Sequence, residues 1–246
     1  TPRSDSSAAS DVYKRQDRSP PTEVRKLMAD DQGYDPDVWS MLSNQLGLCG
    51  IAVAEQYGGA GFGPQELAIA CEEMGRALYC GPYLASAVCA AYALSQTADD
   101  DHKQRWLPEI ASGGLIACLA VTEHAPMWSE DDVQTVASSS PGGGHVLNGE
   151  KRFVIDAQVA GLILIAARNG ENQIGLYAVE ANARGLTSNA MPSMDPTRKL
   201  NQLILADTPA EHLGPVDLQD LMDYTLVALA NEMIGGAQTL LQSALD

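Results

Sequence analysis

The sequence predicts an α+β multi-domain chain with an N-terminal helical domain, a middle antiparallel β-barrel-like domain and the start of a C-terminal helical bundle that is cut short. Apolar residues recur at helical spacing up to residue 113, form short or alternating runs from 114 to 214, and return to helical spacing from 215. Turn sequences such as "PGGG" (141–144) separate the short runs. We therefore expect domains over 17–113, 114–214 and 215–246.

Residues 1–16 differ from the rest of the chain. "SSAASDVYKRQ" (6–16) has no apolar periodicity and resembles, residue for residue, the in-frame translation of a transposase sequencing adapter. We expect residues 1–16 to be adapter-derived and disordered, and leave them out of fold prediction. The helical pattern at the other end stops at Asp246 without a capping sequence, which predicts a fragment.

Composition excludes several classes of protein. Of the 246 residues 45% are apolar, enough for a packed core, and the net charge of −17 argues against nucleic acid as a partner. The longest apolar run, "VAGLILIAA" (159–167), is too short to span a membrane. The five cysteines form no C-x-x-C pair and no histidine pair has metal-ligand spacing, so we expect no metal. Cys71, Cys80 and Cys89 lie among apolar residues, which predicts buried free thiols in a reducing compartment.

A helix is expected over 34–47. Asp35 can cap its N-terminus, Pro36 suits the first helical position and Gly47 can end it. Trp39, in this helix, either packs in the core or lines a substrate pocket, and the same alternatives apply to Tyr83.

Further helices are expected over 63–82, 83–96 and 99–113. The first has an apolar stripe and ends at Gly81-Pro82, and the second is apolar nearly all round and therefore buried. In the third, Pro108 should kink or break the helix near Leu107. The stripe of the first comprises Leu67, Cys71, Met74 and Leu78.

The middle part reads as strands. Asn148-Gly149 is a strong hairpin signal, and "NGEN" after residue 168 is a second turn. From Asp217 the helical period returns with an apolar side. The expected strands are 115–122, 133–139, 145–155, 161–168, 173–180 and 199–207, and the apolar side of the last helix comprises Leu221, Tyr224, Ala228 and Met233.

Several motifs indicate turns rather than sites. "EQYGGAGFG" (55–63) fails the G-x-G-x-x-G spacing because position 64 is Pro, and no βαβ unit surrounds it. "GHVLNGEK" (144–151) leads into a strand, not into the helix that a phosphate loop needs. The four histidines are isolated in the sequence. His124 beside Glu123 is either a local acid–base pair or a surface loop residue.

Five ordered segments together resemble the acyl-CoA dehydrogenase family over about residues 34–246. The first, "LGLCGIAVAEQYGGAGFGPQELAIACEEMGRAL", resembles the N-terminal helical signature of that family. The others resemble the lead into its β-domain, its flavin-contacting hairpin and strand, and two later segments. The five are residues 46–78, 104–123 ("QRWLPEIASGGLIACLAVTE"), 147–168 ("LNGEKRFVIDAQVAGLILIAAR"), 194–205 ("MDPTRKLNQLIL") and 232–241 ("EMIGGAQTLL").

The resemblance implies an FAD enzyme of the bacterial cytoplasm that oxidises an acyl-CoA thioester to the trans-2-enoyl-CoA. It also implies a tetramer that passes electrons to an electron-transfer flavoprotein. In the family a glutamate removes the α-proton, and both it and the Arg-x-Gln-Phe-Gly flavin segment fall beyond residue 246. We therefore name no catalytic residue in this chain and expect these 246 residues alone to be inactive. Glu232 matches neither family base position and is expected to be a surface or interface residue.

The family's flavin contacts map onto two segments of this chain. The strand and loop after residue 118 would offer backbone groups and the Thr122 hydroxyl to the isoalloxazine edge. Phe153 stands where the family has an aromatic residue against the flavin, and Ser129 stands in a loop that the family uses for both cofactor and substrate. The complete set of expected FAD-binding residues is Leu119, Ala120, Val121, Thr122, Ser129, Phe153, Val154 and Ile155, with Ser129 also substrate-binding.

Two departures from the family pattern leave the role of this site open. The family loop after Thr-Glu contains a glycine that lets backbone N–H groups approach phosphates, whereas "HAPMWSEDD" (124–132) has none. Ile155 stands where the family has Thr or Ser, and isoleucine cannot donate a hydrogen bond to flavin N5. Similar departures occur in bacterial steroid- and dicarboxylate-degrading subfamilies, some of them heteromeric. The chain either holds FAD in an altered way or is a flavin-poor structural subunit that completes a partner's active site. A direct oxidase is a third alternative.

Overall fold

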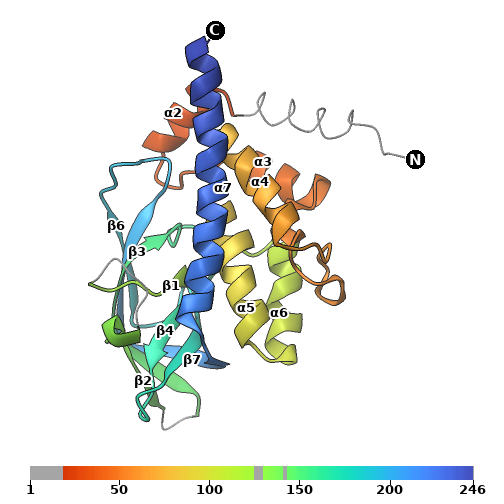
Figure 1. Ribbon diagram of the computed structural model, residues 1–246. Coiled ribbons are helices and arrows are strands. Elements are labelled where there is room, and N and C mark those ends of the chain that lie inside the picture. The colour runs from red at the N-terminus through yellow and green to blue at the C-terminus, as the bar shows by residue number, and fades with distance from the viewer. Residues whose placement is uncertain (1–18, 125–129, 141–142, 246) are drawn as a thin grey trace.

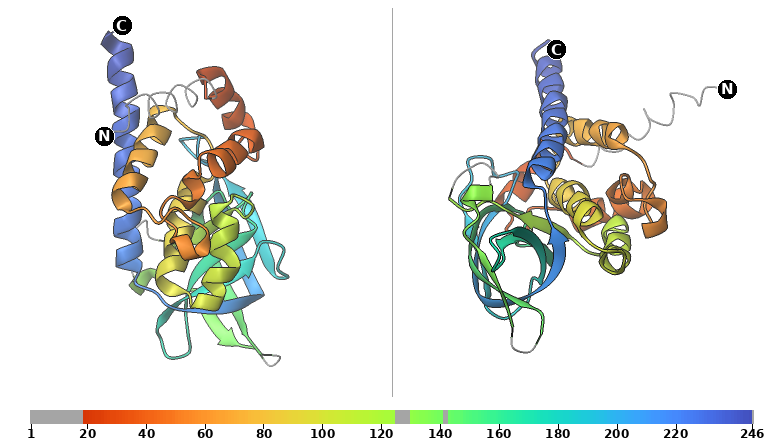
Figure 2. Two further views of the ribbon diagram at one scale, coloured as in Figure 1. Left: turned by 90° about the vertical axis from the view of Figure 1, so that its right-hand side faces the viewer. Right: turned by 60° about the horizontal axis from the view of Figure 1, so that its bottom comes forward.

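The computed structural model describes residues 19–124, 130–140 and 143–245. Short helices lie on one side and a β-barrel on the other, and the long helix α7 runs past both (Figures 1 and 2). This order of helices, barrel and helix is the architecture that the sequence predicts.

The N-terminal helices begin where their capping residues stand. Asp35 accepts hydrogen bonds from the N–H groups of Asp37 and Val38, and Asp99 accepts one from His102. Gly47 ends the first predicted helix with φ 65°. The helices are α2 (Pro21–Ala29), α3 (Pro36–Ser40) with a π-helical continuation (Met41–Gln45), α4 (Pro64–Arg76), a π-helical segment (Tyr83–Ala90) leading into α5 (Ala91–Thr97), and α6 (Asp100–Ala111).

The predicted break at Pro108 does not occur, and the predicted helix end at Gly81-Pro82 is wrong. α6 continues through Pro108, because Leu107 and Ile110 are fully buried and the Ser112 N–H donates to the Pro108 carbonyl, so packing outweighs the one missing hydrogen bond. α4 ends at Arg76, before Gly81-Pro82. Leu78 follows that end with φ 47° and is 54% exposed, so it does not belong to the buried stripe.

The strands of the described residues form one seven-stranded sheet that closes on itself. β4, β2, β3, β7 and β5 pair in that order, and β5 pairs back with β4, which gives the ring in the right-hand view of Figure 2. Pairing is mainly antiparallel, but β1 and β2 pair with β4 in parallel. The strands are β1 (Ala117–Ala120), β2 (Val136–Ser139), β3 (His145–Ile155), β4 (Leu162–Arg168), β5 (Ile174–Glu180), β6 (Leu186–Met191) and β7 (Leu200–Pro215).

β4 is buried on both faces, which explains its uninterrupted apolar sequence. Leu162 and Leu164 belong to the core between the barrel and the helices, whereas Ile163 and Ile165 belong to the core inside the barrel. On the neighbouring strand β1, the buried Ser86 hydroxyl accepts the Ala117 N–H, which ties the helical layer to the sheet. The strand therefore joins two separate cores.

Asn148-Gly149 does not form the predicted hairpin. Both residues lie inside β3, at a bulge where the register with β7 shifts. The Asn148 amide exchanges two hydrogen bonds with Asp207, each of 2.9 Å. A Cβ on Gly149 would lie 2.8 Å from the Thr135 Cα, so this glycine permits the close approach of β3 to the chain just before β2.

Helix α7 (Leu218–Leu245) presents one buried and one exposed apolar side. Leu221 and Ala228 are buried as predicted, but Met233 is 74% exposed, which contradicts its assignment to the packed side. At the crossing with α4, Gly75 and Gly235 let the two backbones touch, since a Cβ on either would lie 1.8 Å from a carbonyl oxygen of the other helix. None of the described helices is long and apolar enough to cross a membrane.

We expect Gly75→Ala to lower the free energy of unfolding by about 1–3 kcal/mol, because its methyl group would collide with the Glu232 carbonyl. Gly236→Ala is the matched control: its Cβ would lie 3.6 Å from the nearest oxygen, and alanine favours helix by about 1 kcal/mol. Urea unfolding measures both. Equal stability of the two variants would contradict the close crossing.

Candidate functional site

The two segments predicted to contact a cofactor lie side by side. The Arg152 N–H donates to the Thr122 carbonyl at 2.8 Å, so the chain after β1 continues alongside the end of β3. Thr122 and Ile155 are half-buried and Phe153 is 45% exposed. Leu119, Ala120, Val121 and Val154 are buried, so their side chains pack in the two cores and only their backbone groups could reach a ligand. Ser129 lies outside the described residues.

Phe153 is held in an unusual conformation. It occupies a second bulge of β3, where the pairing with β7 shifts between Lys151 and Val154, and its φ is 55°. Its N–H faces the Met191 Sδ at 3.5 Å, a weak acceptor. A non-glycine residue with positive φ costs about 1–3 kcal/mol and is common at ligand-binding positions. The bulge turns an aromatic ring outward beside Thr122.

A buried ion pair fixes the backbone on which these residues stand. The Lys151 Nζ donates to the Glu123 Oε1 at 2.7 Å and to the Val121 carbonyl at 3.1 Å. The side chains are 0% and 3% exposed, respectively. Lys151 precedes Arg152 in β3, and Glu123 follows Thr122, so the pair clamps both segments from inside.

The remaining lone pairs of Glu123 bind the entry to β2. Its carboxylate accepts the N–H of Gln134 and both the N–H and hydroxyl of Thr135, at 2.7–2.9 Å. Burial raises the pKa of Glu123, but the Lys151 ammonium and these donors lower it by more. The net result is a pKa below the ordinary value. His124 is exposed while Glu123 is fully engaged, which favours the surface-loop interpretation of that histidine.

The sequence analysis missed this pair, although the pattern contained a signal. In β3, Leu147, Gly149 and Lys151 occupy alternate positions, and Leu147 faces the barrel interior. A lysine in that register must be paired if it is buried. Burial lowers the pKa of Lys151 to about 8 despite Glu123.

The described residues at the surface of these two segments, Thr122 and Phe153, suit a flat ring system. Phe153 offers a ring that is 45% exposed, its N–H donates to the Met191 sulfur, and the Thr122 backbone is paired with the neighbouring Arg152. Ile155 supplies no donor at its position. The FAD contacts expected from the family resemblance would here fall to Phe153, its N–H and Thr122, and Ile155 would offer apolar packing in place of a donor.

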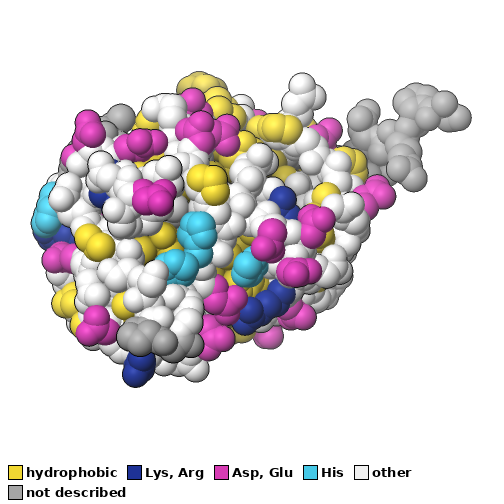
Figure 3. All heavy atoms as spheres, turned by 90° about the horizontal axis from the view of Figure 1, so that it is seen from below, with side chains coloured by type: hydrophobic (Ala, Val, Ile, Leu, Met, Phe, Trp, Pro, Cys, Tyr) yellow, Lys and Arg dark blue, Asp and Glu magenta, His cyan; other side chains and the backbone are white. Residues whose placement is uncertain are grey.

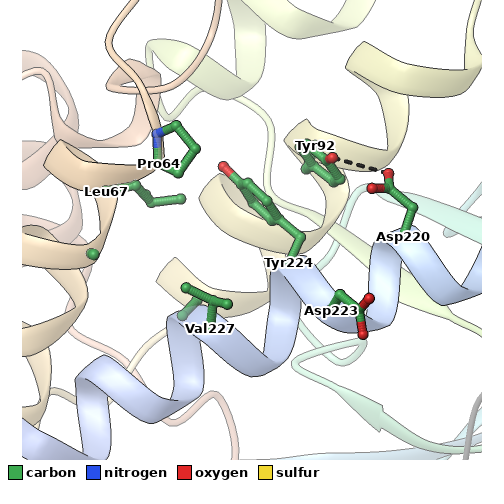
Figure 4. A pocket seen from close by; sticks show the side chains of 9 residues that line it. Pro64, Leu67, Tyr92, Asp220, Asp223, Tyr224 and Val227 are labelled. Atoms are coloured by element: carbon green, nitrogen blue, oxygen red, sulfur yellow. Dashed lines mark hydrogen bonds between the residues drawn. The ribbon is translucent and has the colours of Figure 1, made fainter.

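An apolar cavity borders the helical layer next to α7. This cavity of about 200 Å³ opens between α4, α5 and α7, and its lining is mainly apolar (Figure 4). Trp39 and Tyr83 do not line it: both are buried, and they donate to the carbonyls of Gly113 and Leu48. These two aromatic residues are core residues.

Glu232 is partly buried. It forms an ion pair with Arg198, from the loop between β6 and β7, and about one-fifth of each side chain is exposed. Burial raises the pKa of Glu232, although Arg198 opposes the shift. The pair joins α7 to the loop before β7.

Three histidines that are isolated in the sequence come together at one end of the molecule (Figure 3). The His145 and His212 rings are 5.6 Å apart, and His102 lies 3.5 Å from Glu211. Burial lowers the pKa of His212, and His145 and His102 lower it further. Among the described residues, no group of three or more His, Cys, Asp or Glu side chains could hold a metal ion. All five cysteines are buried and free, which confirms the prediction for Cys71, Cys80 and Cys89.

Comparison with known proteins places this architecture among known folds. Residues 16–114 match the family model "Acyl-CoA dehydrogenase, N-terminal domain". The acyl-CoA dehydrogenase IpdE2 of Mycobacterium tuberculosis is 28% identical over 226 residues, which cover 92% of this chain and 57% of that protein. The chain thus spans little more than half the length of the curated relatives it matches.

Solved structures agree. A steroid ACAD variant, Tcur3481-Tcur3483, is 26% identical with a TM-score of 0.81, covering 95% of this chain and 65% of that one. The ChsE4-ChsE5 complex of Mycobacterium tuberculosis shares the fold, with a TM-score of 0.84 at 23% identity over 98% of this chain and 66% of that one.

We expect Lys151→Met to lower the free energy of unfolding by about 3–5 kcal/mol at neutral pH, because Glu123 would remain buried without its cation. The loss should shrink as the pH falls and Glu123 takes up a proton. Denaturant unfolding across this pH range measures it. Arg152→Met, whose side chain is 40% exposed, is the control and should change stability by no more than about 0.5 kcal/mol. A loss in Lys151→Met as small as in the control would contradict the clamp.

Asp156, directly after Ile155, is 5% exposed, and burial raises its pKa from 3.8 to about 6. The folded state therefore binds a proton that the unfolded state has lost, so this group destabilises the fold as pH rises from 3.8 through 6. Asp156→Asn should stabilise the protein by about 1–3 kcal/mol at pH values above 6, since asparagine also tolerates its φ of 56°. Unfolding curves at several pH values test this; an advantage that does not shrink in acid would refute it.

Proposed function

We propose that this chain is part of an FAD-dependent enzyme that oxidises an acyl-CoA thioester to its trans-2-enoyl product. The proposal starts from the fact that the chain belongs to the acyl-CoA dehydrogenase family. The observation that carries the proposal is the clamped edge formed by Thr122 and Phe153. An outward aromatic ring in a strained bulge, supported by a buried ion pair, suits a planar cofactor.

Each group of this chain has a distinct task in that reaction. Phe153 would pack against one part of the flavin, and Thr122 with nearby backbone groups would bind its polar edge. The apolar cavity beside α7 would take the hydrocarbon part of the acyl group. Bound FAD supplies the hydride acceptor, and the chain's residues hold and orient it. We assign no base among these 246 residues.

A second candidate function is a structural subunit of a heteromeric dehydrogenase. Ile155 favours it, since no hydroxyl stands at that position to bind a flavin nitrogen. One of the structural relatives is itself a complex, ChsE4-ChsE5. Under either function we propose a homo- or hetero-tetramer that passes electrons to an electron-transfer flavoprotein, with a steroid or fatty acyl side chain as substrate.

Absorbance of the purified full-length protein, made alone and with the neighbouring gene, tests the two functions. The enzyme proposal predicts a yellow protein that bleaches when acyl-CoA is added. Phe153→Ala should lower flavin affinity about three- to tenfold, because a stacked aromatic contact contributes about 0.5–1.5 kcal/mol. Phe62→Ala, at the other exposed phenylalanine, is the control and should retain flavin.

Protein that is colourless alone and binds flavin only after co-expression would support the structural-subunit function. Protein that is colourless under both conditions would contradict both functions. Equal flavin retention in the two phenylalanine variants would show that Phe153 does not contact the cofactor.

A further inference from the structure

A polar cavity of about 590 Å³ lies where β6 ends and β7 begins, next to the C-terminal end of α2. Two hydrogen bonds hold the surrounding segments together. The Gln158 Nε2 donates to the Gln32 carbonyl at 3.0 Å, and the Lys199 Nζ donates to the Met28 carbonyl at 2.8 Å. The lining of this polar cavity shares no residue with the apolar cavity beside α7, so the two are separate spaces.

Asn201 lines the polar cavity at a position that suits an apolar residue. It is 3% exposed, and the next alternate positions of β7, Leu203 and Leu205, belong to the core inside the barrel. The Asn201 Nδ2 donates to the Ser188 hydroxyl at 3.3 Å, but its buried Oδ1 accepts no hydrogen bond from the described residues. A buried acceptor without a donor lowers the stability of the fold. Packing alone therefore gives no reason for an asparagine here.

Gln158 offers a second unused acceptor to the same cavity. Its Nε2 faces the Gln32 carbonyl, which can only accept, so the orientation of the side-chain amide is fixed. The Gln158 Oε1 is buried and, within the described part of the chain, accepts no hydrogen bond. Both unused atoms thus need an N–H or O–H donor that the described residues do not supply.

The charges around the polar cavity balance. Arg198 forms an ion pair with Glu232 of α7, and the Lys199 ammonium is offset by the Asp31 carboxylate in the same lining. Neither a cation nor an anion is therefore favoured over a neutral molecule. Met191 and other apolar side chains complete the lining and can contact a hydrocarbon part.

We propose that the polar cavity binds a small neutral molecule that carries a primary carboxamide. The two N–H groups of a carboxamide match the two unused acceptors, the Asn201 Oδ1 and the Gln158 Oε1. The Ser188 hydroxyl accepts from Asn201 and can donate its own proton to the carboxamide oxygen. An ester of the same shape lacks the donors that both acceptors need.

This site does not depend on the proposed function, but it touches the Thr122–Phe153 edge at one point. Met191 lines the polar cavity, and its Sδ accepts the Phe153 N–H. Occupation of the cavity should therefore change the surroundings of the Phe153 amide as well.

Benzamide is the probe, and methyl benzoate, which has the same ring but no N–H group, is the matched compound. Each is titrated into the isotope-labelled 246-residue chain and followed in amide NMR spectra. Benzamide should cause saturable shifts of the Asn201 and Gln158 side-chain amides and of the Phe153 N–H. Methyl benzoate should bind at least about fivefold more weakly, because it leaves buried acceptors unpaired.

Asn201→Leu removes one acceptor and continues the apolar pattern of β7. It should therefore remain folded and weaken the binding of benzamide at least about fivefold. Gln65→Met, at an exposed glutamine of α4, is the control and should bind benzamide as the wild type does. Urea unfolding shows which variants are folded, and Gln158→Met replaces Asn201→Leu if the latter is not.

Equal affinities for benzamide and methyl benzoate would overturn the carboxamide site, because apolar contacts alone would then explain the binding. The proposal also fails if benzamide causes no saturable shift, or if the folded variant that lacks an acceptor binds benzamide as tightly as the wild type.

Discussion

The buried ion pair between Lys151 and Glu123 is the interaction on which the edge formed by Thr122 and Phe153 depends. It joins the chain after β1, the entry to β2 and the centre of β3. Two charges removed from water are expensive unless every lone pair is used, and here the carboxylate accepts from Lys151, Gln134 and Thr135. The ion pair fixes the backbone on which Thr122 and Phe153 stand in adjacent segments.

Packing between the remaining elements fixes the position of that edge. β4 is buried on both faces and therefore couples the barrel interior to the helical layer. On the far side, α7 touches α4 backbone to backbone at Gly75 and Gly235, and Glu232 ties the same helix to the barrel through Arg198. These contacts set the position of Tyr224, and hence of the apolar cavity, relative to the barrel. The edge at Thr122 and Phe153 and the apolar cavity thus follow from one packing arrangement.

Local patterns predicted most of the elements, and tertiary contacts decided the exceptions. Asp35 and Gly47 mark real helix ends because capping acts over a few residues. Pro108 does not break its helix, because its buried neighbours outweigh the local preference. Asn148-Gly149 does not form a hairpin, because it lies in a bulged pairing of β3 with β7. β6 has a largely exposed, polar sequence that gives no periodic signal, and its strand exists because it pairs with β7. Residues of the site such as Phe153 followed from family resemblance, whereas the Lys151–Glu123 pair joins positions 28 residues apart that only the fold brings into contact.

Amide hydrogen exchange tests most directly whether this ion pair is the fixed point of the edge. The N–H groups of Gln134 and Thr135 end on the Glu123 carboxylate, and that of Arg152 ends on the Thr122 carbonyl. If the clamp is rigid, these amides open only with the whole domain and exchange as slowly as those of β4 and β5. Exchange of all three through a local opening, much faster than in β4 and β5, would contradict the account.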